Sequence, residues 1–298
     1  MADTFVLFNQ AAGRGRCARR MDRFRELLLR HVADFDEAGT EAPGDEERLA
    51  DRAIADGYAK IVAIGGDGTW SRVADRIVAS GRKDVMLGLL PGGTGNDFGK
   101  TFGLTWERSE DVVRAIAAGT RRRIDVGRVG RRHFLNVVGF GFDIAVIDDA
   151  SGVPLLKGDA LYRFSALRQL FRFPGLPLEI SADGHPPRWV DHLMLVIANA
   201  RYFGGSFDIA PQADLTDGML DLVSIGNANP LQRARLFGQV SRGEHESSDR
   251  VEIVRGRTFR ISFDRPLDYE IDGEVHASEG TAVEVEAVPG ALDLIVPE

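Results

Sequence analysis

The chain has 298 residues, of which 44% are hydrophobic and 28% charged, so it is long enough for one large or two ordinary domains and too apolar to be disordered. Its formal net charge of −8 argues against a protein that coats nucleic acid through a basic surface. A single cysteine excludes an internal disulfide, and no apolar run approaches the roughly 20 residues of a membrane-spanning helix. The N-terminus lacks the basic segment of a signal peptide, so we expect a cytoplasmic protein.

The first part of the chain alternates short apolar runs with helical patterns. The runs that predict buried strands cover residues 5–8, 61–64 and 85–90. Apolar residues recur at helical spacing over residues 18–32, 46–58 and 69–80. Strands that alternate with helices of this length predict right-handed βαβ units and a mostly parallel sheet.

The pattern changes after residue 121, where short runs separated by Gly, Pro and Asp replace this alternation. Residues 123–129 and 133–138 predict a hairpin across Gly130. The further runs that predict strands are 178–181, 189–198, 219–225, 251–254, 258–263, 269–271, 282–287 and 291–296. Such a series is typical of an antiparallel β-sandwich.

One helical pattern interrupts this second part. Its apolar residues, which predict one buried face of a helix, are Leu161, Phe164, Leu167, Leu170 and Phe171. We place a domain boundary near residue 126. Residues 1–126 are then an α/β domain and residues 127–298 a C-terminal β-rich domain, with an active site in the cleft between them.

The first motif that carries chemistry is Gly65-Gly66-Asp67-Gly68-Thr69, at the junction of a predicted strand and helix. Its glycines allow a tight turn that brings backbone N–H groups close to a ligand, and a helix N-terminus favours phosphate. Asp67 would repel a bare phosphate, so its presence indicates Mg²⁺ between the carboxylate and a nucleotide. A tight turn with a capping aspartate is the alternative for this motif alone.

A second motif, also at a strand end, is Pro91-Gly92-Gly93-Thr94-Gly95-Asn96-Asp97. Thr94, Asn96 and Asp97 offer a hydroxyl, an amide and a carboxylate. Since both motifs follow strands predicted to be neighbours, both should open on the same carboxyl edge of a parallel sheet. Neither motif is a P-loop, because no Lys-Ser or Lys-Thr pair follows the glycines. A loop with an aspartate cap is the alternative.

In combination, the two motifs resemble the diacylglycerol kinase catalytic-domain family of lipid kinases, which includes bacterial lipid kinases and sphingosine kinases. The first motif alone is also similar to NAD kinases and phosphofructokinases, so the resemblance rests on the combination. The further stretches that resemble the family are 139–143, 199–205, 210–213, 217–221 and 271–274. The likeness runs from Asn9 nearly to the C-terminus and implies an NAD kinase/phosphofructokinase-like first domain. Gln10 departs from it, because the family commonly has proline there.

The resemblance implies a role for each matching residue. The residues that it places around the nucleotide are Asn9, Gly13, Thr40, Gly65, Gly66, Gly68, Thr69, Gly93, Thr94 and Asn96. Those that it ties to the catalytic Mg²⁺, directly or through water, are Asp67, Asp97 and Asp125. For Asp125, an ordinary strand-end carboxylate is the alternative. A second, structural metal site of some bacterial members matches Asp214, Asp217 and Met219, largely through main-chain oxygens.

Asp272, with Glu274 beside it, matches the proposed general base of the family. Phosphoryl transfer needs positioning, charge neutralisation by metal and a carboxylate that accepts the proton of the attacking hydroxyl. Asp67 and Asp97 would supply the metal side from the first domain, and Asp272 the base from the second. Taken alone, Asp272-Gly273 is equally a signal for a hairpin turn.

The resemblance therefore implies a kinase that uses ATP and Mg²⁺ to phosphorylate a lipid hydroxyl, with diacylglycerol as the first candidate. The alternatives are a sphingoid base, phosphatidylglycerol, a soluble acceptor as in NAD kinase, and a nucleotide-binding regulator without turnover. We expect peripheral, reversible contact with the inner face of the membrane, since the chain has no lipidation signal. In that case residues 161–173 could help to receive acyl chains. No nucleic-acid partner is expected, and the sequence leaves a homodimer open.

Overall fold

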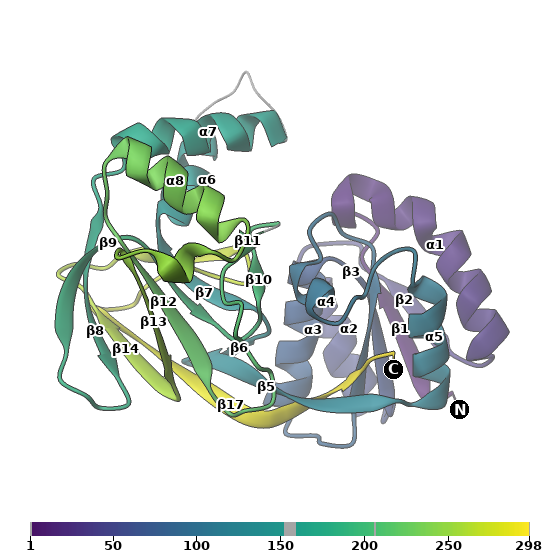
Figure 1. Ribbon diagram of the computed structural model, residues 1–298. Helices are drawn as coiled ribbons and strands as arrows, with labels where there is room; N and C mark the ends of the chain where they lie inside the picture. Colours follow the sequence, from purple (N-terminus) through teal and green to yellow (C-terminus); the bar gives the residue numbers. More distant parts are fainter. Residues whose placement is uncertain (1, 152–158, 206, 298) are drawn as a thin grey trace.

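The computed structural model describes residues 2–151, 159–205 and 207–297. The elements of its first part are β1 (Thr4–Phe8), α1 (Ala12–His31), β2 (Asp36–Gly39), α2 (Asp45–Ala55), β3 (Lys60–Gly65), α3 (Asp67–Ala79), β4 (Met86–Pro91), α4 (Asp97–Thr101) and α5 (Ser109–Ala118). Four of these strands form a parallel sheet in the order β2-β1-β3-β4. Helices α1 and α5 pack together on one face, and α2 and α3 on the other (Figure 1).

The apolar strands and helices of this part form one core. β1 is buried along its whole length, as a parallel strand covered by helices on both faces must be. α1 adds Phe24 and Leu28 to the core. Its first turn holds three left-handed residues, Gly13, Arg14 and Gly15, with φ of 61°, 58° and 76°. The regular part of α1 therefore follows Gly15.

The second part contributes the remaining strands, β5 to β17. Its elements are β5 (Arg121–Val129), β6 (Arg132–Phe134), β7 (Val137–Gly141), α6 (Phe142–Ser151), α7 (Asp159–Arg172), β8 (Leu176–Ala182), β9 (Arg188–Ala198), β10 (Tyr202–Phe203), β11 (Phe207–Asp208), β12 (Leu220–Gly226), α8 (Pro230–Val240), β13 (Val251–Gly256), β14 (Thr258–Ser262), β15 (Asp268–Ile271), β16 (Glu274–Ala277) and β17 (Ala282–Ile295). Among the described residues, no helix is both long and apolar enough to cross a bilayer.

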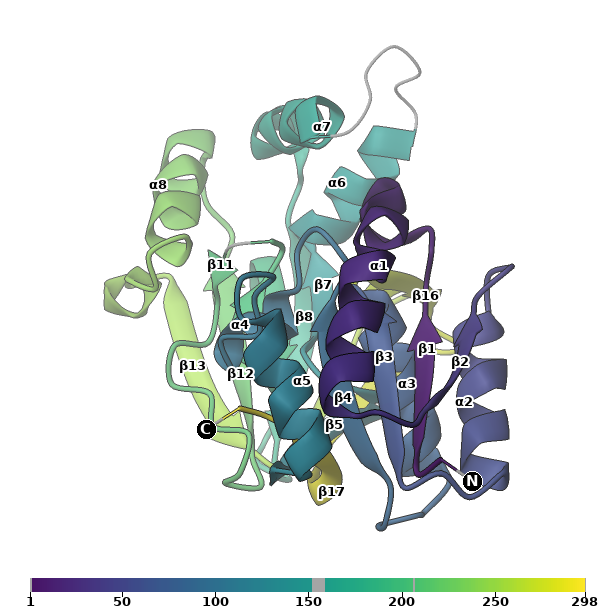
Figure 2. The ribbon, with the colours of Figure 1, turned by 90° about the vertical axis from the view of Figure 1, so that its right-hand side faces the viewer.

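These strands pack as an antiparallel sandwich, which confirms the predicted combination of an α/β domain with a C-terminal β-sandwich. Phe140, Leu195 and Phe259 lie in the core between its sheets. β9 pairs with β7, β8 and β12. A separate apolar cluster, to which Phe142 and Leu236 belong, packs α6 and α8 against the outer side of β9 and β12 (Figure 2).

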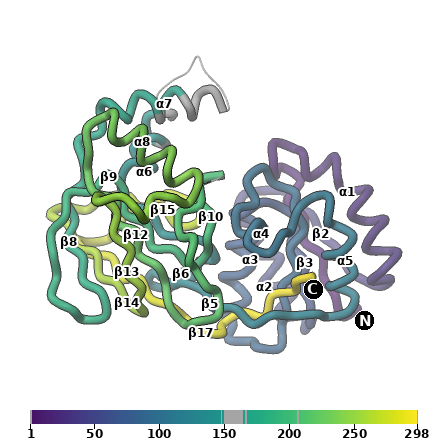
Figure 3. Tube along the Cα trace, in the orientation of Figure 1, coloured from purple at the N-terminus to yellow at the C-terminus, as the bar shows by residue number. Residues whose placement is uncertain are grey.

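One strand belongs to both parts of the molecule. β17 first pairs with β14 and β5 in the sandwich, and then lies between β4 and β5 in the first sheet. Leu292, Leu294 and Ile295 are accordingly buried in the first core. Figure 3 shows β5 and β17 running together from one part to the other. The end of β17 thus completes the α/β sheet, although the division at residue 126 assigns it to the second domain.

Two predicted strand boundaries differ from the structure. The predicted strand 133–138 is two strands, because the chain turns at Leu135 and Asn136 between β6 and β7. The predicted strands 282–287 and 291–296 are one strand, β17, whose register with β5 shifts between Val288 and Leu292. Pro289 lies in this irregular step, where a strand tolerates proline.

The predicted buried face of the helix over residues 161–173 is wrong for three of its members. Phe164, Leu167 and Phe171 are 44%, 57% and 69% exposed, while Phe173, just beyond α7, is buried. α7 packs against α6 and α8 with its opposite side, which leaves these three side chains outward. The side chain of Leu161 lies outside the described part of the structure.

Candidate active site

The two glycine corners lie side by side at the carboxyl ends of β3 and β4. The amides of Gly92 and Gly93 donate hydrogen bonds to the carbonyl oxygen of Gly65, at 2.7 and 2.9 Å. A Cβ atom at Gly93 would lie 2.5 Å from the Cα of Gly66, so only glycine fits there. These contacts confirm the prediction that both motifs open on the same carboxyl edge of the parallel sheet.

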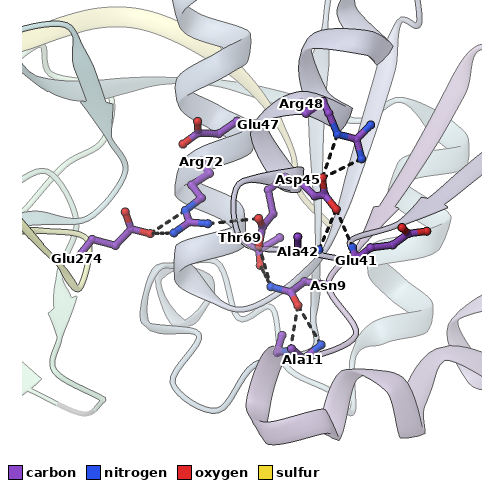
Figure 4. Close-up of polar contacts among 12 residues, drawn as sticks. Asn9, Ala11, Glu41, Ala42, Asp45, Glu47, Arg48, Thr69, Arg72 and Glu274 are labelled. Carbon is purple, nitrogen blue, oxygen red and sulfur yellow. Dashed lines mark hydrogen bonds and ion pairs between the residues drawn. The ribbon is translucent and has the colours of Figure 1, made fainter. Parts of the chain in front are cut away.

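Asn9 shapes a cavity beside the first corner. Its side-chain nitrogen donates to Glu46 Oε1 at 2.8 Å and to Thr69 Oγ1 at 3.1 Å, and its oxygen accepts from the amides of Ala11 and Ala12 (Figure 4). The neighbouring cavity, of ≈ 600 Å³, is lined by Asn9, Gln10, Ala11, Thr40, Glu41, Ala42, Pro43, Glu46 and Arg72. Small-molecule ligands occupy sites of this size. The structure therefore brings Asn9, Thr40 and Thr69 together, as the nucleotide prediction requires.

The other predicted nucleotide residues surround the corners. Gly13 packs against the second corner, where a Cβ atom would lie 2.8 Å from the carbonyl oxygen of Gly92. Gly68 lies in the first turn of α3. Asn96 is left-handed, with φ of 49°, and precedes α4, while Thr94 is exposed. The nucleotide contacts of these residues stay a prediction.

Asp67 and Asp97 bring two carboxylates together at this edge. A Cβ atom at Gly95 would lie 3.3 Å from Asp67 Oδ2 and 3.9 Å from Asp97 Oδ2, so both carboxylates flank one residue. Asp97 also accepts hydrogen bonds from the Gly205 amide and from Lys100 Nζ, each at 2.6 Å. Burial, and next the charge of Asp97, raise the pKa of Asp67 to about 6.

This pair of carboxylates fits a magnesium ion. Mg²⁺ takes oxygen ligands and is commonly bound by one or two carboxylates, with water and substrate phosphates completing its shell. A cation between Asp67 and Asp97 would also relieve the repulsion that raises the pKa of Asp67. Within the described residues, no group of three or more His, Cys, Asp or Glu side chains is placed to hold a metal ion. The remaining ligands would therefore come from water and nucleotide.

Asp272 enters from the second domain, in the turn between β15 and β16. Its Oδ2 accepts hydrogen bonds from Ser71 Oγ at 2.6 Å and from the amide of Leu135 at 2.8 Å. Its Oδ1 accepts from the amides of Asn136 and Val137, each at 2.9 Å. Burial raises the pKa of Asp272, although these donors oppose the shift. The Ser71 bond joins the predicted base to α3 of the first domain.

One cavity, of ≈ 220 Å³, unites acids from both domains. It is lined by Asp67, Asp97, Asn136, Val137, Asp143, Phe203, Gly204, Glu270, Asp272 and Gly273. We call it the acid cavity. Three of its acids are predicted from the sequence, whereas Asp143 and Glu270 are not. Asp143 closes the stretch 139–143 that resembles the family, and that resemblance was the available signal for it.

Glu274 does not line the acid cavity. Arg72 donates to Glu274 Oε1 from Nε at 2.7 Å and from Nη2 at 2.6 Å, and Arg132 Nη1 lies 3.7 Å from Oε2. Arg72 also lies 3.3 Å from the buried Glu46 (Figure 4). Glu274 is thus part of an ion-pair contact between the two domains, and its predicted catalytic role is not supported by its position.

Asp125 is also placed apart from Asp67 and Asp97. It is buried, its Oδ2 accepts from the amide of Gly218 at 2.6 Å, and its Oδ1 accepts from the amide of Gly290 at 2.7 Å. These bonds connect the loop before β12 and the irregular step of β17 to β5. The structure therefore does not bring Asp125 into the acid cavity.

The residues of the second predicted metal site lie in an exposed loop. Asp214 Oδ1 accepts from the amide and hydroxyl of Thr216, and Asp217 Oδ1 accepts from the amide of Met219 at 2.9 Å. Asp217 Oδ2 lies 3.4 Å from Arg255 Nη1. Both carboxylates are thus hydrogen-bonded within their own loop, and Asp217 also pairs with an arginine. This second site stays a prediction.

The fold and the site together define a class of kinases, in which a glycine-cornered α/β domain and a β-sandwich share one acid-lined cavity. Comparison with known proteins identifies the same two domains. Residues 3–129 match the diacylglycerol kinase catalytic domain, and residues 136–296 match the YegS C-terminal NAD kinase beta sandwich-like domain. The chain belongs to the diacylglycerol kinase catalytic-domain family of lipid kinases, and membership of a kinase family implies the use of ATP.

Individual relatives extend over most of the chain. A diacylglycerol kinase of Mycobacterium tuberculosis is 29% identical over 258 residues, which is 85% of this chain and 82% of the relative. A Pseudomonas aeruginosa protein described as a probable lipid kinase YegS-like is 31% identical over 298 residues, covering 93% and 96%. The crystal structure of a diacylglycerol kinase from Bacillus anthracis has the same fold, with a TM-score of 0.79, 22% identity and coverage of 99% and 97%.

Proposed function

We propose that the protein transfers the γ-phosphoryl group of ATP, with Mg²⁺, to the hydroxyl of a lipid presented at a membrane surface. The observation that carries the proposal is the acid cavity, in which Asp67 and Asp97 of one domain face Asp272 of the other. Diacylglycerol is the reference acceptor, because relatives of that name match most of the chain. A sphingoid base and phosphatidylglycerol are the other lipid acceptors to test.

The residues divide the work of the reaction. The acceptor oxygen forms a bond to the γ-phosphorus while the bond from that phosphorus to the ADP oxygen breaks, and the acceptor proton passes to Asp272. The three backbone amides that bind Asp272 are fixed in place, whereas the Ser71 hydroxyl can rotate away. Its rotation would free a lone pair of the Asp272 carboxylate, and this lone pair takes the acceptor proton. Bound between Asp67 and Asp97, Mg²⁺ would neutralise charge on the phosphates.

Labelled ATP and a panel of lipid, nucleotide and sugar acceptors test the proposal. We expect label in a lipid product identified by mass spectrometry, and none when EDTA removes Mg²⁺. The Mg²⁺ concentration that gives half-maximal rate should rise as the pH falls through about 6, because a protonated Asp67 binds the ion less well. Asp67→Asn should raise this half-maximal Mg²⁺ concentration at every pH and make it depend less on pH.

Label in NAD or a sugar phosphate alone would assign the protein to a soluble acceptor instead. ATP binding without label in any product would assign it to the regulators that have lost turnover. Asp84→Asn, an exposed carboxylate before β4, is the matched control and should keep the wild-type Mg²⁺ dependence.

We further propose that α7 docks on the bilayer. Phe164, Leu167 and Phe171 occupy one face of this helix and are exposed, and Arg172 at its end is exposed beside them. Apolar side chains with a neighbouring cation suit a membrane that carries anionic lipid. α7 packs against α6, whose first turn holds Asp143 of the acid cavity, so docking would bring that cavity close to the lipid (Figure 2).

The double variant Leu167→Ser/Phe171→Ser should weaken binding to vesicles of phosphatidylcholine and phosphatidylglycerol by about tenfold or more, since each side chain loses apolar burial. Vesicle flotation measures the change. Turnover of a water-soluble short-chain acceptor should stay at the wild-type value. Leu29→Ser removes an equally exposed leucine from α1 and is the control. Equal flotation of the double variant and the wild type would contradict docking through α7.

A further inference from the structure

Among the described residues, two of the five acids in the acid cavity, Asp143 and Glu270, have neither a side-chain partner nor a place in the proposed metal site. Asp272 is satisfied by four donors, and Asp67 and Asp97 fit a metal ion. Asp143 and Glu270 are 5% and 3% exposed. Within the part of the chain that the structure describes, both carboxylate oxygens of Asp143 and the Oε1 of Glu270 are buried without a hydrogen-bond partner from another side chain.

The backbone creates the space for this pair. Gly139 on β7 lies opposite Glu270 on β15 in the sheet, and Asp143 turns back over it from the first turn of α6. A Cβ atom at Gly139 would lie 2.5 Å from Asp143 Oδ2 and 3.2 Å from Glu270 Oε1. Both carboxyl groups therefore converge on Gly139, a position in β7 that carries no side chain.

Burial raises the pKa of both groups, and the charges of Asp143 and Asp272 raise the pKa of Glu270 further. Hydrogen bonds from the amides of Asp143 and Ile144 at the start of α6 lower the pKa of Asp143, but they offset only part of the effect of burial. No Lys, Arg or His is among the described residues that line the cavity. Unpaired buried acids destabilise a fold, so a pair of them facing a cavity indicates a ligand that supplies donors.

We propose that Asp143 and Glu270 bind the headgroup of the acceptor lipid, and that this acceptor carries a second hydrogen-bond donor, a hydroxyl or an ammonium group, beside the hydroxyl that is phosphorylated. The inference rests on the proposed lipid kinase function and narrows its substrate class. A volume of ≈ 220 Å³ accommodates a headgroup and leaves the acyl chains outside.

The chemistry of the lipids discriminates among acceptors. A 1,2-diacylglycerol has one hydroxyl, and its two ester carbonyls only accept hydrogen bonds, so it would leave the acid pair unsatisfied. A monoacylglycerol, a phosphatidylglycerol headgroup or a 2-amino-1,3-diol brings a second donor within reach. A site built to bind a donor rejects an analogue that lacks it, because its own buried groups then stay unpaired.

The test compares three acceptors of matched solubility with the full chain: 1,2-dioctanoylglycerol, 1-monooctanoylglycerol and a short-chain 2-amino-1,3-diol. We expect kcat/KM to be at least about tenfold higher for one of the two-donor acceptors than for dioctanoylglycerol, and the better of the two identifies hydroxyl or ammonium as the donor. Asp143→Asn and Glu270→Gln should each reduce this preference by about tenfold or more. Asp148→Asn, an exposed carboxylate farther along α6, is the control and should preserve the preference.

Thermal unfolding separates binding from structure. Because each amide variant removes a buried, unpaired acid, its Tm should equal or exceed that of the wild type. A lower Tm, or an unchanged acceptor preference in both variants, would overturn the headgroup role. If the wild type used dioctanoylglycerol as well as or better than the two-donor acceptors, the proposal of a second donor would be overturned, while the lipid kinase proposal would remain intact. Failure to phosphorylate any lipid would overturn both.

Discussion

Replacing Asp272 with asparagine should lower the rate of phosphoryl transfer by about 10²- to 10⁴-fold, the range that a general base contributes. The amide cannot take the acceptor proton, while asparagine tolerates the left-handed backbone at this position, where φ is 48°. The variant also loses one acceptor for the Ser71 hydroxyl and the Leu135 amide. Initial rates at saturating ATP and acceptor measure the loss, and calorimetric titration with ADP should show that the nucleotide still binds.

The pH profile of the wild type gives an independent test of this base. Only the ionised carboxylate accepts the proton, so the rate should fall as the pH falls through the pKa of Asp272. Because burial raises that pKa, the fall should begin at a higher pH than for a free aspartate. Asp268→Asn, at the exposed start of β15, the strand that precedes this turn, should retain both rate and profile. A wild-type rate in the Asp272→Asn variant would exclude Asp272 as the base.

Gly93→Ala should disrupt both glycine corners. The added Cβ would lie 2.5 Å from Gly66 Cα and 2.7 Å from Asn96 Oδ1, and the backbone of the first corner cannot move aside as a flexible side chain would. The hydrogen bond from the Gly93 amide to Gly65 would be lost as the corners separate. We expect loss of ADP binding and a decrease of about 1–3 kcal/mol in the free energy of unfolding, measured by calorimetry and urea denaturation.

Gly280→Ala is the matched control for this steric effect, since no atom of the described residues other than its chain neighbours lies within 4 Å of a Cβ at Gly280. Its ADP affinity and stability should equal those of the wild type. If Gly93→Ala bound ADP normally, the two corners would not form the nucleotide site.

The α/β domain was predictable because its signals are local. Each glycine corner joins an apolar strand to a helix within a few residues, and the parallel order of β3 and β4 follows from that alternation. In the second domain, α6 begins directly after the buried strand β7, so no polar boundary marks it. α8 does carry a local signal, since Asn229 and Gln232 form a complete capping box around Pro230.

The candidate site was predictable only where its residues stand in motifs. Asp67 and Asp97 follow glycine corners, so the sequence alone indicates a metal there. Glu270 gives no such signal, because its position depends on the pairing of β15 with β7 opposite Gly139. Contacts between distant segments likewise determine that Glu274 binds Arg72 rather than entering the acid cavity. The spacing of residues along the sequence does not reveal in which register these distant segments pair.

The strand that begins in one core and ends in the other constrains how the protein can move. β5 and β17 remain hydrogen-bonded over the junction, with one register shift, and both ends of this two-stranded ribbon are fixed in sheets. Sliding of one half along the other would break strand register on both sides, whereas bending of the ribbon would not. The halves can therefore open and close as a hinge, in which the Ser71–Asp272 and Arg72–Glu274 contacts separate together.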